Sequence, residues 1–202
     1  MHKVDLMHYV NLSDVAVITL PLEYKGVEIM FILPHDFSKY ALEQAAFKYF
    51  STSGLKQLWE KQTIQRITLD LPKFEIRFKI SLKETLKKIG LNRSFSDDAE
   101  FPRIAKQHLK ITDVIHEAYL KIEEQGTKDF ASTSEFQHKG INFDPLVDEL
   151  IFFKVDRPFN IAIFSTQTYQ PILTGMIVNL GEEEKEDNNS ENNNDNNNDN
   201  EL

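Results

Sequence analysis

Apolar and polar residues alternate with a period of two over residues 66–80, and this pattern constrains the fold more than any other. Such a period places alternate side chains on opposite faces of a β-strand, so it predicts a long strand that is buried on one face. Pro72 interrupts the alternation, and we expect the strand to bend there because proline donates no hydrogen bond to a neighbouring strand. The apolar positions are Ile67, Leu69, Leu71, Phe74, Ile76, Phe78 and Ile80.

Other segments indicate the same class of fold. The further predicted strands, rich in β-branched and aromatic residues, cover residues 15–20, 27–33, 110–123, 151–155, 159–164 and 172–178. Three short helices are also predicted. The first covers residues 41–50, the second begins after a cap at Thr52 or Ser53, and the third runs from a capping box at 81–84 to Gly90. The sequence therefore predicts an α+β fold with mostly antiparallel sheets and a few short helices.

The C-terminal segment 181–202 differs from the rest of the chain in composition. It consists almost entirely of Glu, Asp and Asn, a low-complexity composition that lacks the apolar surface needed to offset the entropy of ordering. We expect a disordered acidic tail after a single domain of residues 1–180. With nine acidic residues and one lysine, the tail holds most of the net charge of −9. The near-neutral domain therefore gives no electrostatic reason to expect nucleic acid or an anionic membrane as a partner.

Catalytic and metal-binding motifs are missing from the sequence. There is no nucleophile elbow, zinc-protease helix, phosphate-binding loop or dinucleotide fingerprint, and no cysteine. The six histidines are scattered without ligand spacing. We therefore expect neither enzymatic activity nor a cofactor or metal.

A polar stretch of 25 residues, 126–150, has no convincing period. Loops of this length inside a compact domain are uncommon and usually functional. The strand that precedes it contains His116 and Ala118, and Gly126-Thr127 follows after two acidic residues. Together with three further motifs, at residues 71–74, 153–159 and 173–179, this region resembles the serpins, a family of serine protease inhibitors.

The resemblance covers residues 5–180 and only the C-terminal half of the family fold, so the N-terminal half is expected to be absent. It implies a reactive centre loop at about 124–150, which a serine protease attacks as a suicide substrate before the loop inserts into a β-sheet. The implied hinge residues are Glu123, Glu124, Gly126, Thr127, Asp129, Ala131 and Thr133. The implied family signature consists of Phe153, Val155, Asp156, Arg157, Pro158 and Phe159.

The resemblance also implies a scissile bond and a sheet residue. The candidate scissile region is Lys139, Gly140 and Ile141, and Lys139 would suit a trypsin-like protease, whose specificity pocket binds a cation. His116 is implied to lie in a hydrogen-bonded cluster under the sheet. A monomer is expected. An extracellular location is implied by the family, with a cytoplasmic one as the alternative because the chain has no apolar signal segment near its start.

The loop departs from the pattern of inhibitory serpins, in which small residues follow Gly-Thr. Here Lys128, Asp129 and Phe130 follow. If Thr127 points inward on insertion, the period of two also sends Asp129 and Glu135 inward, at a cost of several kcal/mol for an unpaired carboxylate. Two alternatives therefore remain: a non-inhibitory serpin that serves as a binding or carrier protein or as a protease substrate, and a truncated chain that folds poorly.

Deletion of residues 181–202 is predicted to leave the melting temperature unchanged, because a segment of this composition has no apolar surface to pack. Differential scanning calorimetry of the full and shortened chains provides the comparison. A clear fall in melting temperature on deletion would show that the tail contacts the domain.

Overall fold

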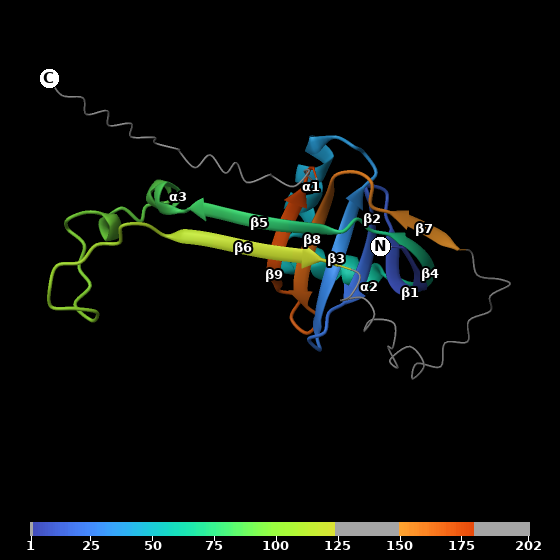
Figure 1. Ribbon diagram of the computed structural model, residues 1–202, viewed down its shortest axis with the longest axis horizontal. Coiled ribbons are helices and arrows are strands. Elements are labelled where there is room, and N and C mark those ends of the chain that lie inside the picture. The colour runs from blue at the N-terminus through green and yellow to red at the C-terminus, as the bar shows by residue number, and fades with distance from the viewer. Residues whose placement is uncertain (1, 124–149, 180–202) are drawn as a thin grey trace, which may run out of the picture.

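The computed structural model describes residues 2–123 and 150–179, which form a seven-stranded sheet and a separate two-stranded sheet (Figure 1). The strand order is β7-β4-β1-β2-β3-β8-β9 in the large sheet and β5-β6 in the small one. The strands are β1 His2–Asn11, β2 Val15–Pro21, β3 Val27–Pro34, β4 Thr63–Asp70, β5 Phe74–Ser81, β6 Ile115–Ile122, β7 Ile151–Lys154, β8 Phe159–Ser165 and β9 Pro171–Ile177. The helices are α1 Lys39–Tyr49, α2 Thr52–Lys61, α3 Lys83–Lys88 and a 3-10 turn, Arg93–Phe95.

The large sheet is centred on β2, β3 and β8. The predicted strands 15–20 and 27–33 are confirmed as β2 and β3, which pair antiparallel, and β8 pairs antiparallel with the other edge of β3. Phe31 lies between Ile18 of β2 and Ile161 of β8, and all three residues are buried. Pairing is antiparallel throughout the described sheets except between β4 and β7, so the predicted α+β class is confirmed.

Each face of the large sheet carries its own apolar core. One face packs against α1 and α2 through a cluster that includes Val17, Met30, Tyr49 and Leu55. The opposite face packs against the base of the β5–β6 ribbon, whose first residue, Phe74, is buried there. Because both faces are covered, the central strands read as continuous apolar runs rather than as alternating ones.

Two serines begin the helices α1 and α2. The Ser38 hydroxyl accepts a hydrogen bond from the Ala41 amide at 3.2 Å, and Ser51 accepts one from Gly54 at 3.1 Å. These bonds satisfy amides that have no partner within the helix. The prediction of Thr52 or Ser53 as the second cap is wrong by one or two positions, because Ser51 has the extended backbone that a cap requires.

The predicted long strand over residues 66–80 is two strands in different sheets. β4 ends at Asp70 and β5 begins at Phe74, and the chain crosses between sheets around Pro72. β4 also begins earlier than expected, at Thr63, and β6 begins at Ile115 rather than near residue 110. β1 was not predicted, because its apolar residues follow no clear period; pairing with both β2 and β4 stabilises it.

The predicted capping box before α3 is not formed. Leu82, rather than Ser81, occupies the cap position, and the Ser81 hydroxyl donates instead to Asp113. The predicted stop at Gly90 is confirmed. Gly90 has a φ of 104°, which glycine adopts without strain, and its amide donates to the Lys87 carbonyl at 3.0 Å.

Substitution of Gly54 by alanine is predicted to destabilise the fold by about 2 kcal/mol or more, despite the higher helix propensity of alanine. A Cβ there would lie 2.6 Å from the Lys48 carbonyl oxygen and 2.7 Å from the Tyr49 Cα, both backbone atoms at the end of α1. Gly175→Ala is the matched control, since its Cβ would meet only the Ile177 side chain at 3.8 Å. Urea unfolding measures both, and equal effects would contradict the predicted close approach of the helices.

Asp14 connects the β1–β2 turn to the end of α1. Its carboxylate accepts hydrogen bonds from Lys48 Nζ at 2.7 Å and from the Tyr49 hydroxyl at 2.9 Å. Burial alone would raise the pKa of Asp14, but the hydrogen bonds from Lys48 and Tyr49 and the charge of Lys48 outweigh it, and the pKa lies below 3.8. The same hydrogen bond, which Lys48 donates to Asp14, raises the pKa of Lys48 to about 12.

The lowered pKa of Asp14 predicts a contribution to stability that is present above pH 3.8 and is lost as the pH falls through the folded-state pKa. In the wild-type chain, the free energy of unfolding should therefore fall between about pH 5 and about pH 2.5. In Asp14→Asn this fall should be smaller by up to about 1 kcal/mol, a modest difference because the Asp14–Lys48 pair is half-exposed. Urea titrations at the two pH values measure this difference. Glu60→Gln, which alters an exposed pair on α2, is the control. If Asp14→Asn loses as much free energy of unfolding between the two pH values as the wild-type chain does, the prediction is contradicted.

Candidate functional site

The candidate site begins on β6, the strand that leads into the predicted reactive loop. β6 pairs antiparallel with β5, and opposite residues such as Phe78 and Ala118 share a face of the ribbon. The base of that face packs on the large sheet through Ile76, Leu120 and Ile122. The far end extends past the large sheet toward α3, as Figure 1 shows.

His116 lies on this far end of β6, opposite Ile80, and is exposed. Its ring centroid lies 6.2 Å from that of Phe78. The hydrogen-bonded cluster that the resemblance implies around His116 stays a prediction.

Glu123, the first hinge residue, follows directly after β6. Its carboxylate lies 2.6 Å from Lys121 Nζ, and this hydrogen bond, together with the negative charge, raises the pKa of Lys121. The other hinge residues, Glu124, Gly126, Thr127, Asp129, Ala131 and Thr133, and the candidate scissile residues Lys139, Gly140 and Ile141 lie outside the described residues.

The segment 124–149 joins two different sheets. It follows β6 of the ribbon and precedes β7, which is an edge strand of the large sheet and pairs parallel with β4. Immediately after β7, the Val155 amide donates to the Asp70 carbonyl at 2.8 Å. Both ends of the segment are therefore attached to regular structure.

The signature residues 153–159 are structural. Phe153, Val155 and Phe159 are buried in the core under the ribbon. Within the signature, Arg157 Nη1 lies 3.6 Å from the Asp156 carboxylate.

Arg157 also joins two distant segments of the chain. Its Nε donates to the Pro34 carbonyl at 3.1 Å, and its guanidinium lies 4.8 Å from the centroid of the Phe37 ring. These contacts fasten the start of β8 to the end of β3. Within the described residues, the signature therefore contributes buried side chains to the core and holds the start of β8 against the end of β3.

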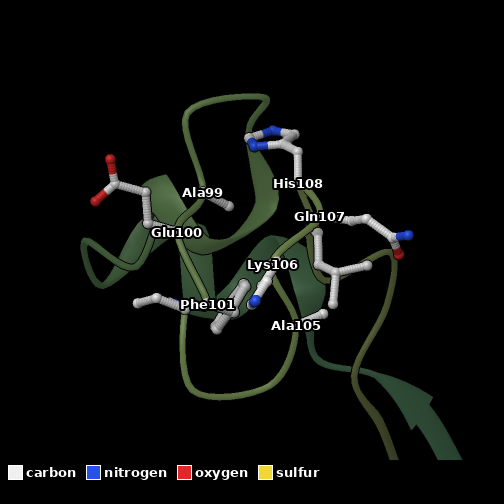
Figure 2. A pocket seen from close by; sticks show the side chains of 9 residues that line it. Ala99, Glu100, Phe101, Ala105, Lys106, Gln107 and His108 are labelled. Carbon is white, nitrogen blue, oxygen red and sulfur yellow. The ribbon is translucent and has the colours of Figure 1, made fainter.

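Several surface hollows lie on the described residues. One lies in the loop between α3 and β6 and is lined by residues 99–102 and 105–109. Figure 2 shows the side chains of Glu100, Lys106 and His108 directed away from one another. Within the described ranges no three metal-ligating side chains come together, and no helix is long and apolar enough to cross a bilayer.

Comparison with known proteins identifies the family. Residues 1–180 match the family described as Serpin (serine protease inhibitor). A serine protease inhibitor of Cyanea capillata is 28% identical over 180 residues, which are 88% of this chain and 46% of that protein. Iripin-4 of Ixodes ricinus is 32% identical over 164 residues, 81% of this chain and 36% of the relative. The chain belongs to the serpin family.

Solved structures agree on the fold. Thyroxine-binding globulin in complex with thyroxine superposes with a TM-score of 0.69 at 23% identity, covering 90% of this chain and 46% of that one. Uncleaved ovalbumin superposes with a TM-score of 0.67 at 21% identity, and the match covers 89% of this chain and 43% of ovalbumin. The predicted family and fold are confirmed, and the chain spans about half the length of the relatives it matches.

Sequence reasoning missed one feature of the site, the open edge of β6. Within the described residues this strand hydrogen-bonds only to β5, which leaves its other side without a neighbouring strand. The sequence does show charged residues, Glu117 and Lys121, at alternate positions of this strand on either side of Tyr119. Alternation alone, however, does not distinguish an edge strand from a central one.

Proposed function

We propose that this chain acts as a serpin-type inhibitor of a serine protease, with residues 124–150 as the reactive centre loop. The observation that carries the proposal is the family match over residues 1–180 together with the open edge of β6, the strand from which the loop leaves. The protein itself catalyses no reaction in this account. A protease that acts outside the cell is the proposed partner, with Lys139 as bait for a trypsin-like enzyme.

The proposed reaction begins as ordinary proteolysis. The protease serine attacks the carbonyl carbon of the scissile peptide bond within 139–141, an ester to the loop forms, and the amine of the next residue leaves. The acylated part of the loop then adds as a strand to the open edge of β6. Strand addition supplies main-chain hydrogen bonds and pulls the protease away before water can hydrolyse the ester.

A non-inhibitory role is the second candidate, and Asp129 favours it. The period of two that would place Thr127 against the sheet places Asp129 there as well. Burying that carboxylate without a partner opposes insertion. If insertion is slower than hydrolysis of the ester, the chain is cleaved as a substrate and the protease is released.

Incubation of the full chain with trypsin, followed by a denaturing gel and intact mass, tests the proposed function. Inhibition predicts a covalent complex that contains the protease and a fragment of the chain. Lys139→Ala should abolish that complex, whereas Lys128→Ala, the matched lysine in the same loop, should retain it. Cleavage within residues 128–150 with active protease left over would support the substrate alternative and contradict inhibition.

Asp129→Ala is predicted to raise the fraction of cleavage events that end in a covalent complex by roughly tenfold, equivalent to about 1.4 kcal/mol of the cost of burying a carboxylate. The ratio of complex to cleaved chain on a denaturing gel measures it. Lys128→Ala, on the opposite face of an inserted strand, should leave the ratio unchanged. An unaltered ratio in Asp129→Ala would show that this carboxylate does not limit insertion.

A further inference from the structure

The connection between α3 and β6 contains a long stretch without regular structure. Residues 96–114, which follow the 3-10 turn, form no helix or strand, and we call them the α3–β6 loop. Stretches of this length inside a domain are uncommon and usually have a function. The proposed inhibitory reaction does not use this loop.

Hydrogen bonds hold the α3–β6 loop on both sides of an unbonded segment. The Ala105 amide donates to the Phe101 carbonyl at 3.2 Å, and the Ile111 amide donates to the Ser94 carbonyl at 2.9 Å. Between these bonds, the backbone groups of residues 106–109 bond to no other described residue, and all four residues are exposed. Local opening of such a segment costs little free energy, because few contacts are broken.

Lys106 is the lysine of this unbonded segment. Its side chain is exposed and forms no ion pair with a described residue, whereas Nζ of Lys110 lies 2.6 Å from the Asp97 carboxylate. Figure 2 shows Lys106 on the loop between Ala105 and Gln107. A trypsin-like protease binds a basic side chain through a carboxylate in its specificity pocket and holds the substrate chain extended. Lys106, followed by three unbonded residues, meets both requirements.

Other basic residues of the described ranges meet these requirements less well. Most of them lie in helices or strands, whose hydrogen bonds would have to open over several residues. Lys25 lies in the tight turn between β2 and β3, where the Val27 amide donates to the Tyr24 carbonyl at 3.0 Å. Arg103 lies inside the turn that is closed by the bond to the Phe101 carbonyl. Two more lie in short links between strands, Lys73 and Arg157.

We propose that Lys106 is a cleavage site for a trypsin-like protease in the folded chain. The protease serine attacks the Lys106 carbonyl carbon, and the Gln107 amine leaves as it takes up a proton. Water then hydrolyses the ester, which releases the Lys106 carboxylate and the free enzyme. The net change is the addition of a water molecule across the Lys106–Gln107 bond.

The cleaved chain is expected to stay together. Three pairs of strands join the part of the chain before Lys106 to the part after it: β3 with β8, β4 with β7 and β5 with β6. Both apolar cores also contain residues from the two parts, such as Phe31 and Phe159 in the core under the ribbon. The fragments 1–106 and 107–202 should therefore separate only when the large sheet unfolds.

Cleavage at Lys106 has a different outcome from the cleavage proposed within residues 139–141. The residue that carries the ester directly follows the turn closed by the Ala105 amide, so no strand-length segment is free to move the protease away. The ester is therefore expected to hydrolyse. If the chain is an inhibitor, Lys106 competes with the reactive loop for the same class of protease. The cleavage itself does not depend on inhibition.

Limited digestion of the full chain with trypsin, read by intact mass and N-terminal sequencing, tests the proposal. Cleavage at Lys106 gives a second fragment that begins at Gln107. Lys106→Gln should slow the appearance of this fragment by roughly a hundredfold or more, because a neutral side chain leaves the carboxylate of the specificity pocket unpaired. Lys88→Gln, which makes the same change of charge on the exposed face of α3, should leave the rate unaltered.

Two measurements show whether the folded chain is the one that is cleaved. In size-exclusion chromatography without denaturant, the two fragments should elute together, and they should part in denaturing urea. The rate of cleavage at Lys106 should change little between 0 and about 1 M urea, because a local opening exposes little surface. Circular dichroism of Lys106→Gln checks that a slower cut does not come from a changed fold.

The proposal is overturned if no fragment beginning at Gln107 appears while the chain remains folded. It is also overturned if the cleavage rate rises with urea in parallel with global unfolding, or if the fragments separate without denaturant. A covalent complex with cleavage confined to residues 139–141 would support inhibition and overturn the site at Lys106. Cleavage at Lys106 without any complex would support the site and contradict inhibition.

Discussion

The pairing of β3 with β8 is the interaction on which the rest of the structure depends. It joins segments that lie more than a hundred residues apart, and it places Phe31 against Ile161 in the centre of the large sheet. Arg157 fixes the start of β8 through the Pro34 carbonyl, and the buried Asn160 side chain donates to the Leu42 carbonyl of α1 at 3.0 Å. Without this pairing, β8 and β9 would be separated from the other five strands, and both apolar cores, which include residues of β3 and of β8, would be divided.

Local patterns predicted the strands near this centre well. The segments of β2, β3, β7, β8 and β9 are short, rich in β-branched or aromatic residues and bounded by turn residues, so composition identifies them. Patterns failed where partners decide the structure. β1 has no clear period and depends on pairing on both sides. The 66–80 alternation gave no sign of the change of sheet, since it continues from buried Ile67 and Leu69 of β4 to the half-exposed Phe78 of β5. Ser51 was missed because three consecutive residues are all suitable caps.

The sequence predicted the buried residues of the signature, but it did not predict the environment of β6. The apolar positions Phe153, Val155 and Phe159 follow a strand pattern, and the structure buries all three. The exposure of His116 was not predictable, because it depends on where the ribbon leaves the large sheet rather than on the sequence around it.

We expect the large sheet to form as a cooperative unit in this chain, which spans about half the length of its relatives or less. Amide hydrogen exchange of the full chain, read by mass spectrometry, tests this claim most directly. The strongest protection is expected in β2, β3 and β8, with weaker protection at the far end of the ribbon, near Ile80 and Ile115. Exchange in β3 and β8 as fast as at the ribbon end would contradict it, because the central pairing would then not hold the sheet together.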